Sequence, residues 1–334
     1  MKRVGILFGM ENTFPGALVE RINGMNVGVA AEFVELGATT MAEPTKHDVI
    51  IDRISQDIPY YRSFLKNAVL AGAEVINNPF WWTADDKFFN YALASKIGVA
   101  VPKTILLPSY KHPPDTTSQS MRNLVFPLPW NEIFSYIGFP AFLKPYSGGG
   151  WKHVYKIQNE EEFFHFYHQT GDLVMTLQEG IEFDEYFRCY VIGQENVLVM
   201  RYDPRRAHEH RYVREDIETE AALERRVEED SRKLCRALGY DINTVEFAVR
   251  DGIPYAIDFL NPAPDAEYTS VGPDNFAWVV NAVADLAVQR ALKSNNAMKD
   301  YRWARFINGG MEPSANQKTA EEVRAKKPVK ATRK

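Results

Sequence analysis

The stretch Phe-Pro-Ala-Phe-Leu-Lys-Pro-Tyr-Ser-Gly-Gly-Gly-Trp-Lys-His, residues 139–153, decides how the chain is interpreted. The apolar run from Ala141 to Leu143 lies between prolines and predicts a buried strand, which leaves Lys144 at the strand end. Residues 148–150 lack Cβ atoms, so the backbone N–H groups after Ser147 can close around anionic oxygens. An ordinary hairpin turn explains these glycines equally well. The stretch alone therefore predicts either a phosphate loop or a hairpin.

Two later regions add acidic groups. Residues 173–178 predict another strand, which is followed by a turn at Glu179 and Gly180. Residues 245–249 and 255–260 predict two strands joined by a tight turn, so that a glutamate at 246 and an aspartate at 258 lie on neighbouring strands. Two carboxylates, an asparagine at 261, a lysine and a glycine loop are the inventory of a magnesium-nucleotide site.

This ordered set resembles the ATP-grasp superfamily. It consists of Lys144, the glycine loop, the Gln178-Glu179 hinge, Arg188, Glu246, Asp258 and Asn261. Residues 185–193, Glu-Tyr-Phe-Arg-Cys-Tyr-Val-Ile-Gly, are similar to the matching strand of glutathione-synthetase-like ligases and of the ligases that add glutamate to a ribosomal protein. The resemblance covers almost the whole chain. It implies an α/β (α+β) ATP-grasp fold, in which a small doubly wound N-terminal lobe precedes two lobes that clamp ATP.

The resemblance also implies a division into domains. Residues 1–102 form the N-terminal α/β domain, and residues 103–310 form the ATP-grasp domain, with a nucleotide lobe over 103–177 and a metal and substrate lobe over 178–310. The alternation of strands and helices over the first eighty or so residues supports a parallel sheet with crossovers. Within it, apolar residues at helical spacing predict a helix over 27–36. The basic, apolar-poor stretch 311–334 predicts a disordered tail.

The resemblance assigns roles to individual residues. Lys144, Arg188 and Arg201 would be the catalytic cations, and ATP with Mg²⁺, or with Mn²⁺ in its place, would be the cofactor. The metal would be held by Glu246, Asp258 and Asn261. Asn261 follows the aspartate by three positions here and by two in the family, so either a bulge restores the geometry or Asn261 is not a ligand. Glu182 or Glu185 would receive the ribose. The residues expected to contact the nucleotide are Lys103, Lys144, Ser147, Gly148, Gly149, Gly150, Trp151, Gln178, Glu179, Gly180, Ile181 and Glu185.

Lys103 and Glu11 each have a plain alternative. Lys103 is either the first phosphate-binding lysine or a solvent-facing residue at a strand edge. Glu11 follows the first strand, at the sheet edge where open α/β sheets bind ligands, so it is a candidate substrate contact. The same loop is equally well explained as solvated, with Asn12 or Thr13 capping the next helix.

A basic segment lies between residues 200 and 214 of a net-acidic chain. Its guanidinium groups suit an anion, either the triphosphate or a carboxylate substrate. The alternatives are a solvated face, contact with a partner, or a minor metal-binding role for the alternating histidines. Its candidate substrate contacts are Arg205, Arg206, His208, His210 and Arg211.

Composition limits the remaining possibilities. The formal net charge of −5 disfavours binding to nucleic acid. Only Cys189 and Cys235 are present, which is typical of a reducing cytoplasm without a disulfide framework. No apolar run approaches the length of a membrane span, so we expect no membrane partner. A homodimer is compatible with the sequence.

These features favour an ATP-dependent ligase. It would activate a carboxylate, on a small molecule or a peptide, as an acylphosphate, and join it to an amine co-substrate. One alternative is a kinase of the same fold that acts on a hydroxyl. The other is a regulatory protein that binds a nucleotide without turnover, for which the irregular interval between Asp258 and Asn261 is the main argument.

Overall fold

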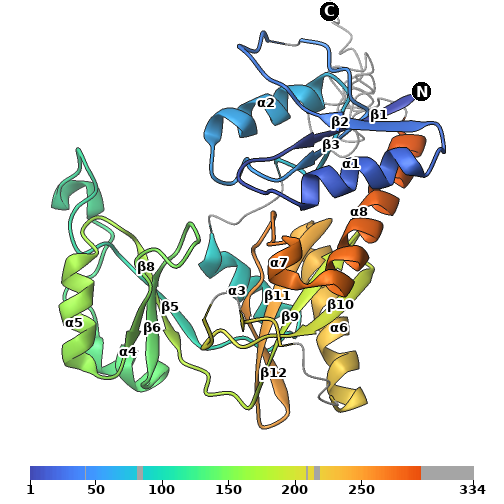
Figure 1. Cartoon of the computed structure of the whole chain (residues 1–334). Coiled ribbons are helices and arrows are strands. Elements are labelled where there is room, and N and C mark those ends of the chain that lie inside the picture. The colour runs from blue at the N-terminus through green and yellow to red at the C-terminus, as the bar shows by residue number, and fades with distance from the viewer. Residues whose placement is uncertain (42, 81–85, 208–209, 214–218, 295–334) are drawn as a thin grey trace, which may run out of the picture. The chain divides into compact units, whose positions relative to one another are not determined.

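The computed structural model describes residues 1–294 except 42, 81–85, 208–209 and 214–218. Three four-stranded sheets carry the described chain (Figure 1). Residues 1–294 form one compact unit. This grouping does not test the predicted domain boundaries at 102/103 and 177/178. The predicted tail over 311–334 lies outside the described residues. Among the described helices, none is long and apolar enough to span a membrane.

The first sheet is parallel, with the strand order β2-β1-β3-β4. Apolar residues of its central strands are buried on both faces, as is typical of parallel strands with crossover helices. Its elements are β1 (Lys2–Leu7), α1 (Phe14–Gly24), β2 (Val29–Phe33), β3 (Val49–Asp52), α2 (Pro59–Leu70) and β4 (Glu74–Ile76). Helix α8 (Pro273–Lys293) packs beside α1, as Figure 1 shows, and covers the sheet from the far end of the chain.

The predicted helix over 27–36 is wrong. These residues contain β2, in which Val29 and Ala31 are buried and alternate with less buried neighbours. The apolar residues of this short segment fit both the helical period of 3.6 residues and the strand period of two. Parallel pairing with β1 selects the extended conformation.

The second sheet is antiparallel, with the strand order β5-β8-β6-β7. Helices α4 and α5 pack on one face through Phe134, Phe163 and their aromatic neighbours. The other face carries Lys144 and Gln178. The elements are β5 (Thr104–Leu107), the short 3₁₀ helix η1 (Ser118–Met121), α4 (Trp130–Ile137), β6 (Ala141–Pro145), β7 (Tyr155–Ile157), α5 (Glu160–Gln169) and β8 (Met175–Glu179).

The third sheet is also antiparallel, with the strand order β10-β9-β11-β12. One face packs on α6 and α3 through Phe187, Cys189 and Phe247, and the opposite face packs toward α8 through Tyr190 and Ile192. The elements are α3 (Lys87–Lys96), β9 (Glu185–Ile192), β10 (Asn196–Arg201), α6 (Ala221–Leu238), β11 (Ile242–Arg250), β12 (Ile253–Asp258) and the single turn α7 (Tyr268–Val271). The two cysteines are buried and free.

Candidate active site

Lys144 stands at the end of β6, where the sequence predicted a strand to release it. Its ammonium donates to the hydroxyl oxygen of Tyr91 and to Oε1 of Gln178, both at 2.8 Å. Burial lowers the pKa of Lys144 to about 8, and the carboxylates of Asp258 and Glu246 oppose that shift. Because both carboxylates act on its pKa, the lysine shares one electrostatic neighbourhood with them. The structure therefore brings together the three groups on which the sequence interpretation depended.

Glu246 and Asp258 are paired across β11 and β12. Glu246 is largely buried and lies 3.3 Å from a guanidinium nitrogen of Arg188, while Tyr186 donates to its other oxygen at 2.7 Å. Burial is the main cause that raises the pKa of Glu246, and Asp258 adds to the rise. Arg188 and the hydrogen bond from Tyr186 act against it. Asp258 is exposed. One carboxylate is thus fixed by the protein, and the other faces solvent.

A β-bulge accompanies this pair. Phe247 is opposite Ala256, but Glu246 is opposite Asp258, so Ile257 of β12 is the additional residue. The irregularity precedes Asp258, and it therefore does not alter the interval between Asp258 and Asn261.

Asn261 is positioned by two neighbours on β11. Its backbone N–H donates to Oδ1 of Asn243 at 2.9 Å, and its side-chain amide donates to Oγ1 of Thr244 at 3.1 Å. Thr244 lies on the same face of β11 as Glu246, because the two are separated by one residue. The amide oxygen of Asn261 accordingly remains available on the carboxylate face.

The oxygen groups of this face suit a magnesium ion. Mg²⁺ prefers hard oxygen ligands and is usually held by one or two carboxylates together with substrate phosphates. Glu246, Asp258 and the amide of Asn261 provide such a set. Within the described ranges, no group of three or more His, Cys, Asp or Glu side chains is arranged to hold a metal by itself. The arrangement therefore fits an ion that is bound jointly with a phosphate ligand.

Arg188 is buried on the same face of the sheet. Its guanidinium lies 5.4 Å from the ring centroid of Tyr202 and 5.9 Å from that of Tyr212. Glu246 binds one of its terminal nitrogens, but Nε of Arg188 and the hydroxyl of Tyr212 are buried and have no hydrogen-bond partner among the described residues. Buried polar groups are normally paired, so these two atoms are suited to an anionic ligand.

The described residues of the basic segment are paired after β10. Tyr202 and Tyr212 form an antiparallel bridge, and the backbone N–H of Asp203 donates to the carbonyl of Arg211 at 2.8 Å. Asp203 also pairs with Arg205 at 2.8 Å and lies 3.7 Å from Arg206. Arg211 lowers the pKa of Glu246, so its charge acts on the carboxylate site.

The histidines of this loop are only partly described. His210 donates its backbone N–H to the carbonyl of Ala207 at 2.8 Å. His208 lies outside the described residues, and its predicted role is left as a prediction.

The structure does not bring Arg201 to the carboxylates. Arg201 is opposite Phe187 in the β9–β10 ladder, and it shares the face that packs on α6. There it pairs with Glu185 at 2.7 Å and with the hydroxyl of Thr219 at 2.9 Å. Arg188 directly follows Phe187 on β9, so its side chain points to the other face of the sheet. Arg201 and Glu185 therefore stabilise each other on the face of the sheet opposite Arg188 and Glu246.

The hinge residues connect two sheets. The N–H of Glu179 donates to the carbonyl of Lys103 at 2.9 Å, and that of Gly180 donates to the carbonyl of Pro140 at 2.8 Å. A Cβ added to Gly180 would lie 2.6 Å from the same Pro140 oxygen, so only glycine permits this approach. The carboxylate of Glu179 pairs with Arg250 of β11 at 3.0 Å. The hinge is thus held from both sides.

Gln178, the first hinge residue, is buried, and its side-chain oxygen accepts the hydrogen bond from Lys144. Its amide nitrogen donates to Oγ1 of Thr104 at 2.8 Å, which fixes the orientation of the amide. Ile181, the last predicted adenine contact, packs partly buried against the core formed around the first and third sheets.

The glycine loop joins β6 to the antiparallel β7, as a hairpin connection. Gly148 and Gly150 have φ values of 83° and 70°, which favour glycine, and a Cβ at either position would meet nothing within 4 Å. Ser147, Gly149 and Trp151 are also exposed or nearly so, the last with 64% of its surface accessible. The glycines thus serve backbone conformation and not close packing, which leaves the loop free to adapt to a ligand.

Lys103 and Glu11 occupy other surroundings. The ammonium of Lys103 lies 5.5 Å from the ring centroid of Tyr136 on α4, the helix that covers the sheet face opposite Lys144. Glu11 pairs with the buried guanidinium of Arg53, with a hydrogen bond of 3.0 Å to its Nε. Arg53 also donates to the carbonyl of Pro264 at 2.5 Å. Glu11 is thus part of a structural ion pair between two segments.

Sequence reasoning missed Tyr91. Its hydroxyl contacts Lys144 and donates to the carbonyl of Ile257, the bulge residue. Nothing in the sequence of the helix Lys87–Lys96 marks this tyrosine as different from a core residue. The hydroxyl of a buried tyrosine requires a hydrogen-bond partner, and this requirement is the feature of the sequence that could have indicated Tyr91.

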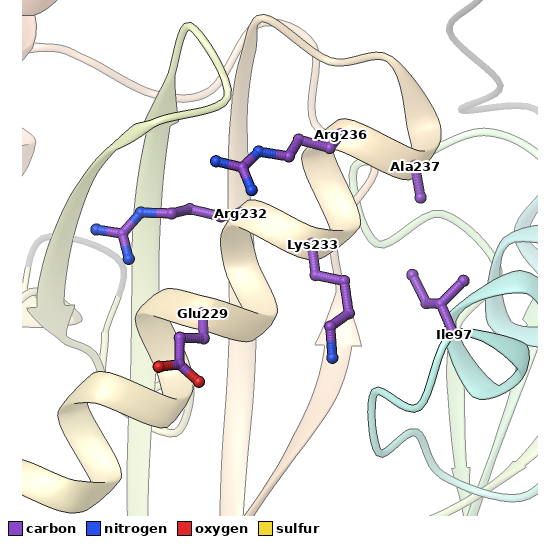
Figure 2. A pocket seen from close by; sticks show the side chains of 6 residues that line it. All are labelled: Ile97, Glu229, Arg232, Lys233, Arg236 and Ala237. Atoms are coloured by element: carbon purple, nitrogen blue, oxygen red, sulfur yellow. The ribbon is translucent and has the colours of Figure 1, made fainter.

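A hollow of about 570 Å³ lies elsewhere, along the outer side of α6 (Figure 2). Figure 2 shows Arg232 and Lys233 on one turn of the helix, where they point to different sides, and Arg236 on the next turn. Arg232 pairs with Glu228 and Arg236 with Glu195, so these cations already have acidic partners. The hollow does not contain the groups described above.

Comparisons with known proteins were made by sequence and by structure. No family model matches the sequence, and no curated protein matches it. Solved structures do match the fold. D-alanine–D-alanine ligase from Bacillus anthracis, complexed with ATP, aligns with a TM-score of 0.58 and 16% identity, covering 87% of this chain and 98% of that one.

Two further structures give the same picture. A RimK domain ATP-grasp protein from Sphaerobacter thermophilus aligns with a TM-score of 0.60 and 15% identity over 87% of this chain and 99% of that one. The ATP-grasp ligase PsnB, complexed with a minimal precursor, Mg and ADP, aligns with a TM-score of 0.55 and 14% identity over 87% and 98%. Identities at this level establish architecture alone. The chain therefore has the ATP-grasp fold that its sequence resembles.

Proposed function

We propose that this chain is an ATP-dependent ligase that joins a carboxylate to an amine. The observation that carries the proposal is the convergence of Lys144 with Glu246 and Asp258, since both carboxylates act on the pKa of the lysine. A phosphate-binding cation and a pair of metal-binding carboxylates in one neighbourhood are what a magnesium-nucleotide site requires.

The nucleotide would be held from several sides. Lys144 would donate to a phosphate oxygen, and the exposed loop from Ser147 to Trp151 would cover the phosphates and exclude water. Residues 178–181 would receive the adenine, for which the fixed hinge offers a rigid edge. The solved D-alanine–D-alanine ligase contains ATP, and PsnB contains ADP with Mg, which supports the choice of nucleotide and metal.

Glu246, Asp258 and Asn261 would hold the metal. A bound Mg²⁺ supplies positive charge that stabilises the transferring phosphoryl group. Glu246 is kept in place by Arg188 and Tyr186, so the chain orients one ligand before any ion arrives.

In the proposed reaction, a carboxylate oxygen of the substrate attacks the γ-phosphorus of ATP, and the bond to ADP breaks. An amine then attacks the carbonyl carbon of the acylphosphate, and phosphate and a proton leave as the amide forms. Arg188 and Arg211 would neutralise charge on the carboxylate and the phosphoryl group. Nε of Arg188 and the hydroxyl of Tyr212, which no described residue pairs with, support an anion at this position.

The contacts of Asn261 support a role as third metal ligand, against the alternative without catalysis. Despite the irregular interval after Asp258, Asn243 and Thr244 hold Asn261 beside the strand that carries Glu246. The substrates proposed for the enzyme are an amino acid or a peptide with a free carboxylate, together with an amine. The macrocyclase MdnC from Microcystis aeruginosa, a solved structure that also matches this fold, is bound with a precursor peptide, which supports the peptide class.

The test is an ADP-release assay with pooled amino acids and peptides as carboxylates and pooled amines, in the presence of Mg²⁺ and ATP. We expect ADP and free phosphate only when a carboxylate and an amine are both present, with an amide product in the mass spectrum. A product that retains the phosphoryl group would replace the ligase by a kinase. ATP binding without ADP under all pools would replace it by a regulatory protein. Asp258→Asn, which removes one predicted metal ligand, is the control for contaminating ATPases.

A further inference from the structure

Tyr91 of α3 has a ring that belongs to the core of the third sheet. The side chain is 5% exposed and meets the ring of Phe259 edge-on, with centroids 5.3 Å apart. It packs in the same cluster as Phe247, the neighbour of Glu246 on β11. The ring is thus anchored to the sheet that carries the carboxylates.

The hydroxyl of Tyr91 reaches in the direction of the second sheet. It donates its hydrogen to the carbonyl of Ile257 and accepts from the ammonium of Lys144 at 2.8 Å. A phenolic hydroxyl has one hydrogen, so its contact with Lys144 can only be that of an acceptor. Ile257 is the bulge residue of β12 and directly precedes Asp258. The hydroxyl therefore connects Lys144 to the backbone beside a predicted metal ligand.

Lys144 has three N–H donors, and two of them are used. One donates to Tyr91 and one to Gln178, a residue of its own sheet. The third donates to no group in the described part of the chain and can meet a phosphate oxygen. A lysine has a flexible four-carbon side chain, and fixing two of its donors reduces the conformational freedom that a ligand must otherwise remove.

We propose that Tyr91 is a positioning residue, which holds the ammonium of Lys144 beside the metal-binding carboxylates so that its remaining N–H meets the phosphates of ATP. This inference rests on the proposed nucleotide site, and it adds a residue and a function to it. It does not depend on the identity of the acid or the amine.

The test is the binding of a non-hydrolysable ATP analogue with Mg²⁺ to the full chain and to Tyr91→Phe, by calorimetry, between pH 6 and 10. The substitution keeps the buried ring and removes only the hydroxyl. Loss of a hydrogen bond to a charged group should weaken binding by about tenfold at pH 7.

The pH dependence gives a second readout. Without the acceptor, the charged form of Lys144 is less favoured, so the midpoint at which binding declines should move to lower pH. The other groups that face the ammonium, Gln178 of β8, Glu246 of β11 and Asp258 of β12, are unchanged by the substitution.

Tyr167→Phe is the matched control. Tyr167 also lies buried in a core and donates its hydroxyl to a backbone carbonyl, that of Pro108 at 2.6 Å, but it belongs to the aromatic cluster around α5. It should leave both the affinity and the midpoint as in the wild-type protein.

Wild-type affinity with a wild-type midpoint in Tyr91→Phe would overturn the inference and leave the proposed function standing. Weaker binding with an unchanged midpoint would also overturn it, because the hydroxyl would then affect binding without acting on the ammonium of Lys144. Absence of binding in the wild-type protein would overturn both proposals.

Discussion

The lowered pKa of Lys144 predicts that nucleotide binding weakens in mildly alkaline solution. A free lysine stays charged well above pH 9, but here burial lowers the pKa to about 8 in the ligand-free protein. Only the ammonium form attracts phosphate, since the neutral amine carries no charge. The affinity for the nucleotide should therefore be high below the pKa that Lys144 has in the folded protein, and should fall as the pH rises through that value.

The magnitude follows from the charged fraction. With a pKa of about 8, roughly nine-tenths of Lys144 is protonated at pH 7 and roughly one-tenth at pH 9. If only the protonated form binds, the dissociation constant for ATP should rise by about tenfold, or ~1.4 kcal/mol, over this interval.

Titration calorimetry in buffers of different ionisation enthalpy measures both consequences. Bound phosphate favours the charged lysine, so binding at pH 9 should take up about one proton, whereas binding at pH 7 should take up almost none. Lys144→Arg provides the control because arginine stays charged throughout, and the dissociation constant of that variant should be nearly independent of pH. A wild-type affinity that is equal at pH 7 and pH 9, without proton uptake, would refute the reasoning.

Three further predictions concern single side chains. Asp258→Asn should abolish ADP formation while the melting temperature stays within a degree or two of wild type, because Asp258 is exposed; near-normal turnover would remove it from the site. Gly180→Ala should destabilise the protein by about 1–3 kcal/mol in urea unfolding, since its Cβ would meet the Pro140 carbonyl, and unchanged stability would show that the hinge relaxes freely. Glu246→Gln should lower the free energy of unfolding by about 3 kcal/mol, because it leaves the Arg188 guanidinium buried without its anionic partner. A Glu246→Gln protein as stable as wild type would contradict that pairing.

Local patterns account for the parts of the site that were predictable. The prolines and the apolar run around Lys144 specify a short strand, and the glycines after it specify a loop whatever the rest of the chain does. Glu246 and Asp258 belong to a hairpin with a tight turn, so their proximity needs no long-range information. Features enclosed within a few dozen residues could therefore be read from the sequence.

The facing of side chains could not be predicted in the same way. A shift of one residue in register moves a side chain to the opposite face of a sheet. Arg201 and Arg188 are both basic residues, but only the ladder between β9 and β10 shows that they point to opposite faces. Lys103 is likewise separated from Lys144 by the sheet itself. Tyr91 depends on contacts with residues far along the chain, which no local period reveals.

The bulge at Ile257 joins these observations. Phe247 is opposite Ala256, and a regular ladder of the same strands would place Ile257 opposite Glu246 and Asp258 opposite Val245. Residues opposite each other share a face, and Val245 faces the core beneath α6. The extra residue instead carries Asp258 to the face of Glu246. The Ile257 carbonyl is the group that accepts the Tyr91 hydroxyl, and Tyr91 in turn contacts Lys144. One irregular residue thus pairs the two carboxylates and connects them to the lysine, so the chemistry proposed for this site depends on a departure from regular strand geometry.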